Sequence, residues 1–110
     1  LNRVVTNLVK NAIQSIPEGK IPKIQVLLSE KSNRIYIKVK DNGSGIEDAI
    51  AEKIFEPKFT TKTSGMGLGL PMVKNIIEAY GGSITYKTTL GKGTLFEVSF
   101  PKKQTPYAVQ

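Results

Sequence analysis

The stretch RIYIKVKDNGSGI, residues 34–46, begins as a strand and ends in glycine-rich turn residues. Its apolar side chains alternate through Ile35, Ile37 and Val39, which is the period of a strand with one buried face. The same alternation carries Asp41 to the apolar side, so we expect a carboxylate at the edge of the core. An Asn-Gly pair normally indicates a hairpin, but the next residues do not read as a returning strand. A helical insertion at this point favours an α+β fold.

A carboxylate beside Gly43 and Gly45 could accept a hydrogen bond from the exocyclic amine of a flat ring, such as that of adenine. The two glycines would let the ring approach the backbone. Alternation in TLFEVSF, residues 94–100, places the Thr94 hydroxyl on the face of the core side chains, where it could join Asp41.

Hydrophobic periodicity and turn residues predict helices and strands along most of the chain. The predicted elements are a helix over 1–16, strands over 23–29 and 34–40, a short helix over 47–55, a helix from about Leu68 to Tyr80, and strands over 83–90 and 94–101. This order predicts an α+β two-layer sandwich, with a mixed, mostly antiparallel sheet and helices on one face. We expect one domain over 1–101, truncated at its N-terminal end, and a tail over 102–110.

The composition is that of a soluble globular domain, with 39% hydrophobic and 23% charged residues in 110. Without cysteine or histidine, the chain has no thiolate or imidazole metal site and no Ser-His-Asp or Cys-His catalysis of its own. A formal charge of +7 suggests an anionic partner, such as nucleotide, acidic protein or nucleic acid. Nucleic acid is disfavoured, because the lysines are scattered and no basic run carries interleaved aromatic residues.

The run GMGLGLPMV, residues 65–73, sets three glycines at alternating positions before a helix. Pro71 fits the first turn of that helix, where its missing N–H costs nothing, so the helix should begin close to Gly69. Free N–H groups and the helix dipole then converge on Gly65, Gly67 and Gly69, which could cradle a phosphate. For such a run taken alone, a flexible hinge before a core helix is the better explanation.

Two asparagines, Asn7 and Asn11, stand four residues apart in the first predicted helix, so they share one face with Lys10 and Gln14 beside them. An amide oxygen suits Mg²⁺ that is held mainly by waters and phosphates. A solvated polar face explains the pair equally well. The apolar stripe of this helix, from which the asparagines point mostly away, comprises Leu1, Val4, Val5, Leu8, Val9, Ala12, Ile13 and Ile16.

Five segments in order, NLVKNA, DNGSGI, IFEPKFTTK, GMGLGL and GKGTLFEVSFP, resemble known sequence boxes. They are similar to the N box, first glycine box, F box, second glycine box and closing strand of the catalytic ATP-binding domain of sensor histidine kinases. That family shares a Bergerat-type fold with the gyrase, Hsp90 and MutL ATPases. The resemblance covers about 1–101. One box alone is a weak signal, whereas five in order are highly specific.

The resemblance implies ATP and Mg²⁺ as ligands and gives residues roles by matching position. Asn11 is implied to coordinate Mg²⁺, with Asn7 and Lys10 on the phosphate side. Asp41 is implied to bind the adenine amino group, and residues 55–65 to form a lid over the nucleotide. The other implied nucleotide contacts are Gly43, Gly45, Ile46, Phe55, Thr61, Lys62, Gly65, Gly67, Leu68, Gly69, Leu70 and Thr94, of which Lys62 is counted with the catalytic residues near the phosphates.

Position 7 separates the branches of the superfamily. The ATPases resemble E-x-x-x-N, with the Glu as general base for water, whereas Asn7 cannot take a proton. The resemblance therefore favours transfer of the ATP γ-phosphoryl group to a His on another domain. The alternatives are an anti-sigma-factor-type serine kinase or ATPase of the same superfamily, and a basic non-enzymatic interaction module. Lys58 stands where the F box more often has an aromatic residue, which leaves the packing of the lid open.

The implied partners are a His-bearing dimerisation domain of the same parent protein and, downstream, a response regulator. Nucleic acid is not among them. Contact with a membrane is expected only through parent segments outside this sequence, because no apolar run here approaches the length of a membrane span. The domain is expected to be cytoplasmic, in a parent that could be a membrane-bound sensor.

Overall fold

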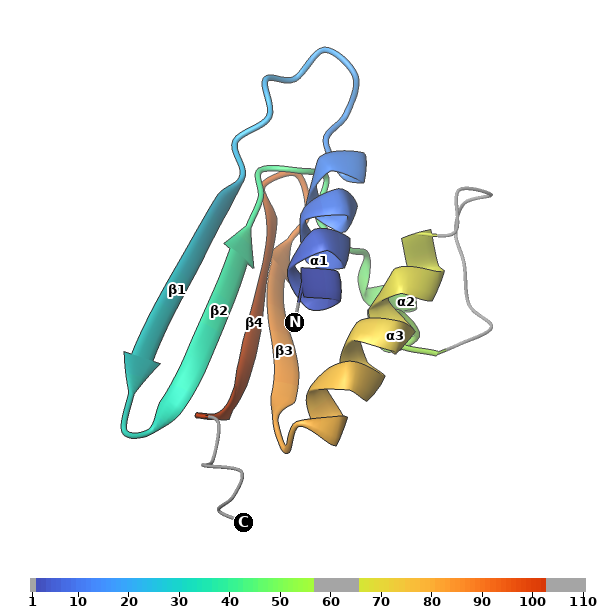
Figure 1. Ribbon diagram of the computed structural model, residues 1–110. Helices are drawn as coiled ribbons and strands as arrows, with labels where there is room; N and C mark the ends of the chain where they lie inside the picture. Colours follow the sequence, from blue (N-terminus) through green and yellow to red (C-terminus); the bar gives the residue numbers. More distant parts are fainter. Residues whose placement is uncertain (1, 57–65, 103–110) are drawn as a thin grey trace.

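The computed structural model describes residues 2–56 and 66–102, except for the side chains of 66–68, and shows a sheet with helices on one face (Figure 1). The strands are β1 (Gln25–Lys31), β2 (Arg34–Lys40), β3 (Ser83–Thr89) and β4 (Gly93–Pro101), and the helices are α1 (Asn2–Gln14), α2 (Asp48–Ala51) and α3 (Met66–Ala79). The strand order is β1-β2-β4-β3. The two-layer α+β sandwich is confirmed. Every pairing among the described strands is antiparallel, so the expected mixed character of the sheet is not found there.

The core lies between the sheet and the helices α1 and α3. Alternate side chains of β2 and β4 enter it, and Ile37 stands opposite Val98 and Val39 opposite Phe96 in the register. Strand β1, at the edge, is exposed along its whole length. The buried apolar cluster consists of Val4, Leu8, Ala12, Ile37, Val39, Ile54, Leu70, Val73, Ile77, Phe96, Val98 and Phe100.

The β1–β2 hairpin is tighter than the sequence predicted. Ser32 and Asn33 form a two-residue turn with φ of 53° and 67°, as in a type I′ turn. Glu30 and Lys31, expected in a four-residue loop, therefore belong to β1, and the strand starts two residues later than expected. The tight turn sets this register, because it forces Lys31 to pair with Arg34.

Helix α1 buries Val4, Leu8 and Ala12 at four-residue spacing, as its pattern predicts. Two of its residues differ from expectation. Ile13, assigned to the apolar stripe, is 54% exposed, and Asn11, assigned to a face mostly turned away from that stripe, is only 5% exposed. Because α1 packs against α3 as well as the sheet, its buried arc includes Asn11 and leaves Ile13 outside.

Helix α3 begins at Met66, two residues before the predicted start. Gly67 and Gly69 therefore lie within its first turn, and Pro71, expected in that turn, is the sixth helical residue and has no N–H to give to the carbonyl of Gly67. The predicted end is confirmed to within one residue. Gly81, with φ of 79°, closes the helix in a Schellman arrangement in which the Gly82 N–H donates to the carbonyl of Ile77.

The short helix expected over 47–55 is regular only in α2, and residues 52–55 continue as turns. None of the helices among the described residues is long and apolar enough to cross a lipid bilayer.

Candidate functional site

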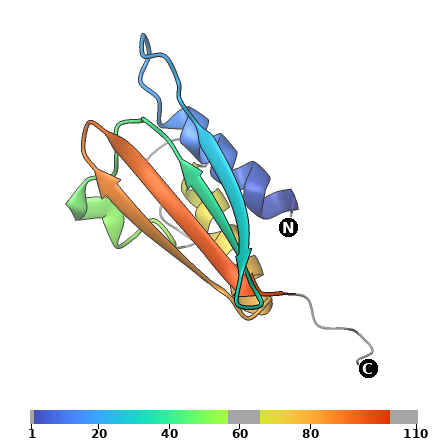
Figure 2. The same cartoon turned by 90° about the vertical axis from the view of Figure 1, so that its left-hand side faces the viewer.

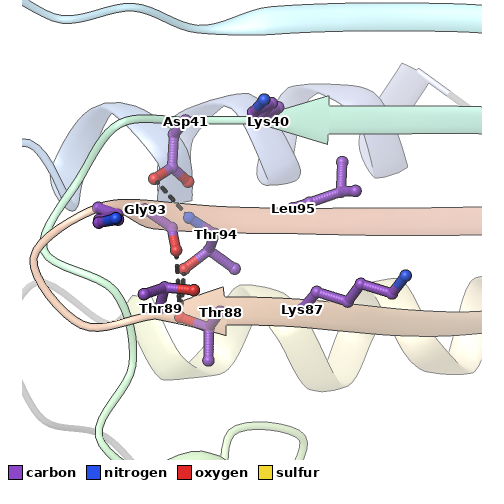
Figure 3. Close-up of a pocket in the computed structure, with 9 residues that line it drawn as sticks. Lys40, Asp41, Lys87, Thr88, Thr89, Gly93, Thr94 and Leu95 are labelled. Atoms are coloured by element: carbon purple, nitrogen blue, oxygen red, sulfur yellow. Dashed lines mark hydrogen bonds between the residues drawn. The ribbon is translucent and has the colours of Figure 1, made fainter.

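Asp41 sits at the end of β2 in the position that strand alternation predicts. Its side chain is buried, and its Oδ1 accepts a hydrogen bond from the backbone N–H of Gly43 at 2.8 Å. The same oxygen accepts the backbone N–H of Thr94 at 3.2 Å (Figure 3). The Asp41 N–H in turn donates to the carbonyl of Thr94 at 2.9 Å. No described residue bonds the second carboxylate oxygen, Oδ2. One oxygen therefore fixes the side chain, and the other is left as an acceptor.

Thr88 is a member of this site that the sequence reasoning missed. Its Oγ1 lies 2.9 Å from Thr94 Oγ1 and donates to the carbonyl of Gly93 at 3.3 Å (Figure 3). It also accepts the Ile46 N–H at 2.8 Å. The signal was present, because Thr88 follows Ile84 and Tyr86 in the same alternation that identified Thr94. Thr88 links the loop after Asp41 to the β3–β4 hairpin.

Packing within the protein explains why positions 43, 45 and 93, near Asp41, are glycine. A Cβ on Gly43 would overlap Ser15, and a Cβ on Gly45 would lie 2.9 Å from the Cα of Leu90. A Cβ on Gly93 would overlap the carbonyl oxygen of Asp41. Close backbone packing thus accounts for these positions without a ligand. We call the cluster of Asp41, Gly43, Thr88, Gly93 and Thr94 the Asp41 corner.

A second cluster, the Asn11 corner, lies where α1 meets α3 and comprises Asn7, Asn11 and Gly69. A Cβ on Gly69 would lie 3.4 Å from Asn7 Oδ1, so Gly69 lies beside the asparagine face of α1. The Asn7 Nδ2 donates to the carbonyl of Arg3 at 2.8 Å. The Asn11 Nδ2 is buried and has no hydrogen-bond partner in the described part of the chain. A buried amide without a partner costs free energy unless something else binds it.

Helix α1 connects the two corners. The backbone carbonyl of Ser15, just past its end, accepts the N–H of Ser44 at 3.0 Å, in the loop that follows Asp41. Asn7, Asn11 and Ser15 are spaced by four residues and so follow one face of the helix for about 12 Å. Among the described residues no cluster of three or more His, Cys, Asp or Glu side chains could hold a metal ion. The Asn11 amide oxygen is a fitting ligand for an ion whose other ligands come from phosphates and water, and the unpartnered Nδ2 is a donor that suits a phosphate oxygen.

The other residues predicted to contact the nucleotide belong to neither corner. Leu70 is 4% exposed in the core, and Ile46 packs on the core while its N–H binds Thr88. The ring of Phe55 lies 6.3 Å from that of Tyr86 and 5.5 Å from Lys74 Nζ, so it closes the core beside α3. Lys10 is exposed on α1. Lys58, Thr61, Lys62 and Gly65 lie outside the described residues, and Gly67 and Leu68 are placed by their backbone alone, in the first turn of α3.

Comparison with known proteins gives concordant matches. The family described as histidine kinase-, DNA gyrase B-, and HSP90-like ATPase matches residues 1–104. Sporulation kinase A of Bacillus subtilis is 42% identical over 103 residues, covering 94% of this chain and 17% of that protein. Sensor histidine kinase ZraS of Salmonella typhimurium is 45% identical over 102 residues, covering 92% of this chain and 22% of that protein. The chain thus spans about a fifth of the length of these curated relatives.

Among solved structures, a nucleotide-free catalytic domain of histidine kinase ThkA superposes with a TM-score of 0.78 at 38% identity, covering 91% of this chain and 64% of that one.

Proposed function

The chain belongs to the family of histidine kinase-, DNA gyrase B- and HSP90-like ATPases, and on that premise we propose that it is the ATP-binding catalytic domain of a two-component sensor histidine kinase. In this proposal it transfers the γ-phosphoryl group of ATP to a histidine on a separate dimerisation domain of the parent protein. A response regulator then receives the phosphoryl group. Because ATP is supplied inside the cell, a cytoplasmic position of the domain is part of the proposal.

The observation that carries this proposal is the Asp41 carboxylate. One oxygen is fixed by two backbone N–H groups, and the other is bonded by no described residue. A fixed acceptor at the buried edge of a sheet can discriminate a ring that bears an exocyclic amine, as adenine does, from one that bears a carbonyl there. The hydrogen bond between the Thr88 and Thr94 hydroxyls, whose oxygens are 2.9 Å apart, holds the β3–β4 hairpin in place beside the Asp41 carboxylate.

The phosphates belong at the Asn11 corner in this proposal. The first backbone N–H groups of α3 have no partner within the helix and would bind phosphate oxygens. The Asn11 Oδ1 would bind Mg²⁺, and its unpartnered Nδ2 would donate to a phosphate oxygen. Bound Mg²⁺ would neutralise phosphate charge during the transfer. The further assignments of Lys10 and Lys62 to the phosphates, and of Thr61, Gly65, Gly67 and Leu68 to the nucleotide, belong to the same proposal.

Asn7 favours phosphoryl transfer over hydrolysis. Its amide lies beside Gly69 and donates to the carbonyl of Arg3, and an amide cannot take a proton from water. Transfer to a histidine needs positioning and charge neutralisation more than a base within this pocket. Bound ATP should therefore persist until an acceptor domain arrives.

The test uses the purified chain with radiolabelled ATP and Mg²⁺. The chain alone should neither label itself on histidine, of which it has none, nor turn ATP over quickly. Adding the His-bearing domain of the parent in trans should give acid-labile, alkali-stable labelling of that domain, at a rate limited by weak docking without the covalent tether. Rapid ATP hydrolysis would instead favour the ATPase branch, and acid-stable labelling would point to the serine-kinase alternative.

A further inference from the structure

The face of the sheet away from the helices collects basic residues that are dispersed in the sequence. Figure 2 shows this helix-free face, with the helices behind it. Strand alternation puts Lys31, Arg34, Lys38 and Glu97 on this face. In the antiparallel register Lys31 stands opposite Arg34, and Lys38 stands opposite Glu97. Leu95 of β4 pairs with Lys40 of β2 on one side and with Lys87 of β3 on the other. Lys92, in the β3–β4 turn, lines the same pocket.

The net charge of the protein is concentrated on this face. Its basic side chains are Lys31, Arg34, Lys38, Lys40, Lys87 and Lys92, and its one acidic side chain among the described residues is Glu97. Six cations against one anion leave five of the seven net positive charges here, and two on all the rest of the chain. The proposed ATP site does not use these lysines, which face away from the core.

An open pocket of about 220 Å³ lies within this face (Figure 3). Lys40, Lys87 and Lys92 lie around Leu95 in its lining. The pocket also reaches the edge of the Asp41 corner, because the rest of its lining is Asp41, Thr88, Thr89, Gly93 and Thr94. Two further apolar side chains are exposed nearby, Leu27 at 49% on the same face as Lys38 and Leu90 at 61% in the β3–β4 turn. Apolar side chains within a ring of charge are typical of protein–protein interfaces.

We propose that the helix-free face, centred on Leu95, is a docking surface for an acidic protein. The partner presents two carboxylates on either side of an apolar side chain, which packs on Leu95 between Lys40 and Lys87. Because these lysines lie on strands two positions apart in the sheet, their Cα atoms are about 10 Å apart, and the two carboxylates match that spacing. Nucleic acid fits less well, since Tyr36 is the one aromatic residue of this face among the described strands and stacking platforms use several.

A labelled helical peptide with Glu at positions i and i+7 and Leu at i+3 tests the proposal. In a helix the two carboxylates share a face and are about 10.5 Å apart along the axis. Fluorescence polarisation should show binding to the chain at low salt that weakens as salt rises. A peptide with the second Glu moved to i+5, on another face, has the same charge and should bind about fivefold more weakly.

The variant Lys40→Glu with Lys87→Glu should weaken peptide binding at least about tenfold. Its matched control is Lys20→Glu with Lys53→Glu, an equal change in net charge at exposed positions outside the sheet, which should weaken binding less than about twofold. Leu95→Ser should also weaken binding, because a purely electrostatic contact would not need Leu95. Circular dichroism checks folding, and the neutral pair Lys40→Gln with Lys87→Gln replaces the reversal if that variant unfolds.

Equal loss of binding in the two double variants, or equal binding of the two peptides, overturns the proposal, because both results mean unspecific attraction. The same measurements with a single-stranded DNA oligomer and with phosphatidylserine vesicles separate the other anionic partners. Tighter binding of either one through Lys40 and Lys87 assigns the face to nucleic acid or membrane instead.

Discussion

The Asp41 corner lies beside the C-terminal end of α1, the Asn11 corner lies one to two turns before that end, and the two are built in opposite ways. At the Asp41 corner, backbone and hydroxyl groups satisfy one another, and glycines allow the backbones to touch. At the Asn11 corner, a buried amide nitrogen has no partner in the described structure. The first corner is pre-organised by the fold itself. The second retains a binding group that the fold does not satisfy, which is where a ligand can contribute most.

Substitutions at the two corners should therefore differ in kind. Changes at the Asp41 corner should reduce stability together with binding, because the same hydrogen bonds serve both. Changes at the Asn11 corner should reduce binding while leaving stability almost unaffected.

Gly93→Ala should have the largest effect. A Cβ there overlaps the Asp41 carbonyl, and the φ of 137° is unfavourable for any side chain. We expect a loss of about 3 kcal/mol in the free energy of unfolding, measured by urea denaturation. Gly91→Ala in the same turn is the control, since its φ is 78° but its Cβ meets nothing within 4 Å. That variant should lose only about 1 kcal/mol, and equal losses would mean that the contact with Asp41 is unimportant.

Asp41→Asn should weaken ATP binding by about 1 to 3 kcal/mol in calorimetry, because a carboxylate acceptor is replaced by an amide. Folding should change less, since the amide oxygen can still accept from Gly43 and Thr94. Asp48→Asn, an exposed position in α2, removes the same charge and should leave ATP affinity unchanged. Unaltered affinity of the folded Asp41→Asn variant would refute the adenine assignment.

Thr88→Val should cost about 1 to 2 kcal/mol of stability, because the Ile46 N–H and the Thr94 hydroxyl lose their partner. It should also reduce the preference for ATP over GTP, since the loop and hairpin beside Asp41 lose their link. Thr88→Ser keeps the hydroxyl and should restore both properties. If the Thr88→Val variant is less stable but prefers ATP over GTP as strongly as the parent chain does, the role of Thr88 is structural only.

Asn11→Ala should have the smallest effect on stability, within about 0.5 kcal/mol of the parent. The lost amide nitrogen had no described partner, and alanine is the better helix former. The Mg²⁺-dependent part of ATP affinity should fall nonetheless, and phosphotransfer in the full-length parent should be largely abolished. Asn75→Ala on the exposed side of α3 serves as the control. Normal labelling by the Asn11→Ala kinase would contradict the Mg²⁺ assignment.

Local patterns predicted much of this molecule. Alternation through Ile35, Ile37 and Val39 placed Asp41 correctly on the core side, and the same rule placed Thr94. Glycines after α3 marked its end to within one residue. These predictions succeed because strand and helix periods are properties of neighbouring residues.

The failures concern contacts between distant segments. Asn11 was expected on a face mostly turned away from the apolar stripe, and it is buried because α3 packs on that side of α1. A Cβ on Gly43 or Gly45 would meet Ser15 or Leu90, a packing reason for glycine that the sequence did not show, and their predicted contact with a ring stays a prediction. A sequence does not show which segment will fill the space beside a glycine.

The sequence by itself determined which side chains share a face of each strand and which five boxes identify the family. Only the tertiary structure decided that Thr88 bonds Thr94, that Asn11 Nδ2 is buried without a partner among the described residues, and that five of the seven net charges gather on one face. The physical reason is that alternation assigns a residue to one side of its own strand. The strand order β1-β2-β4-β3 and the packing of both long helices on one face decide what that side meets.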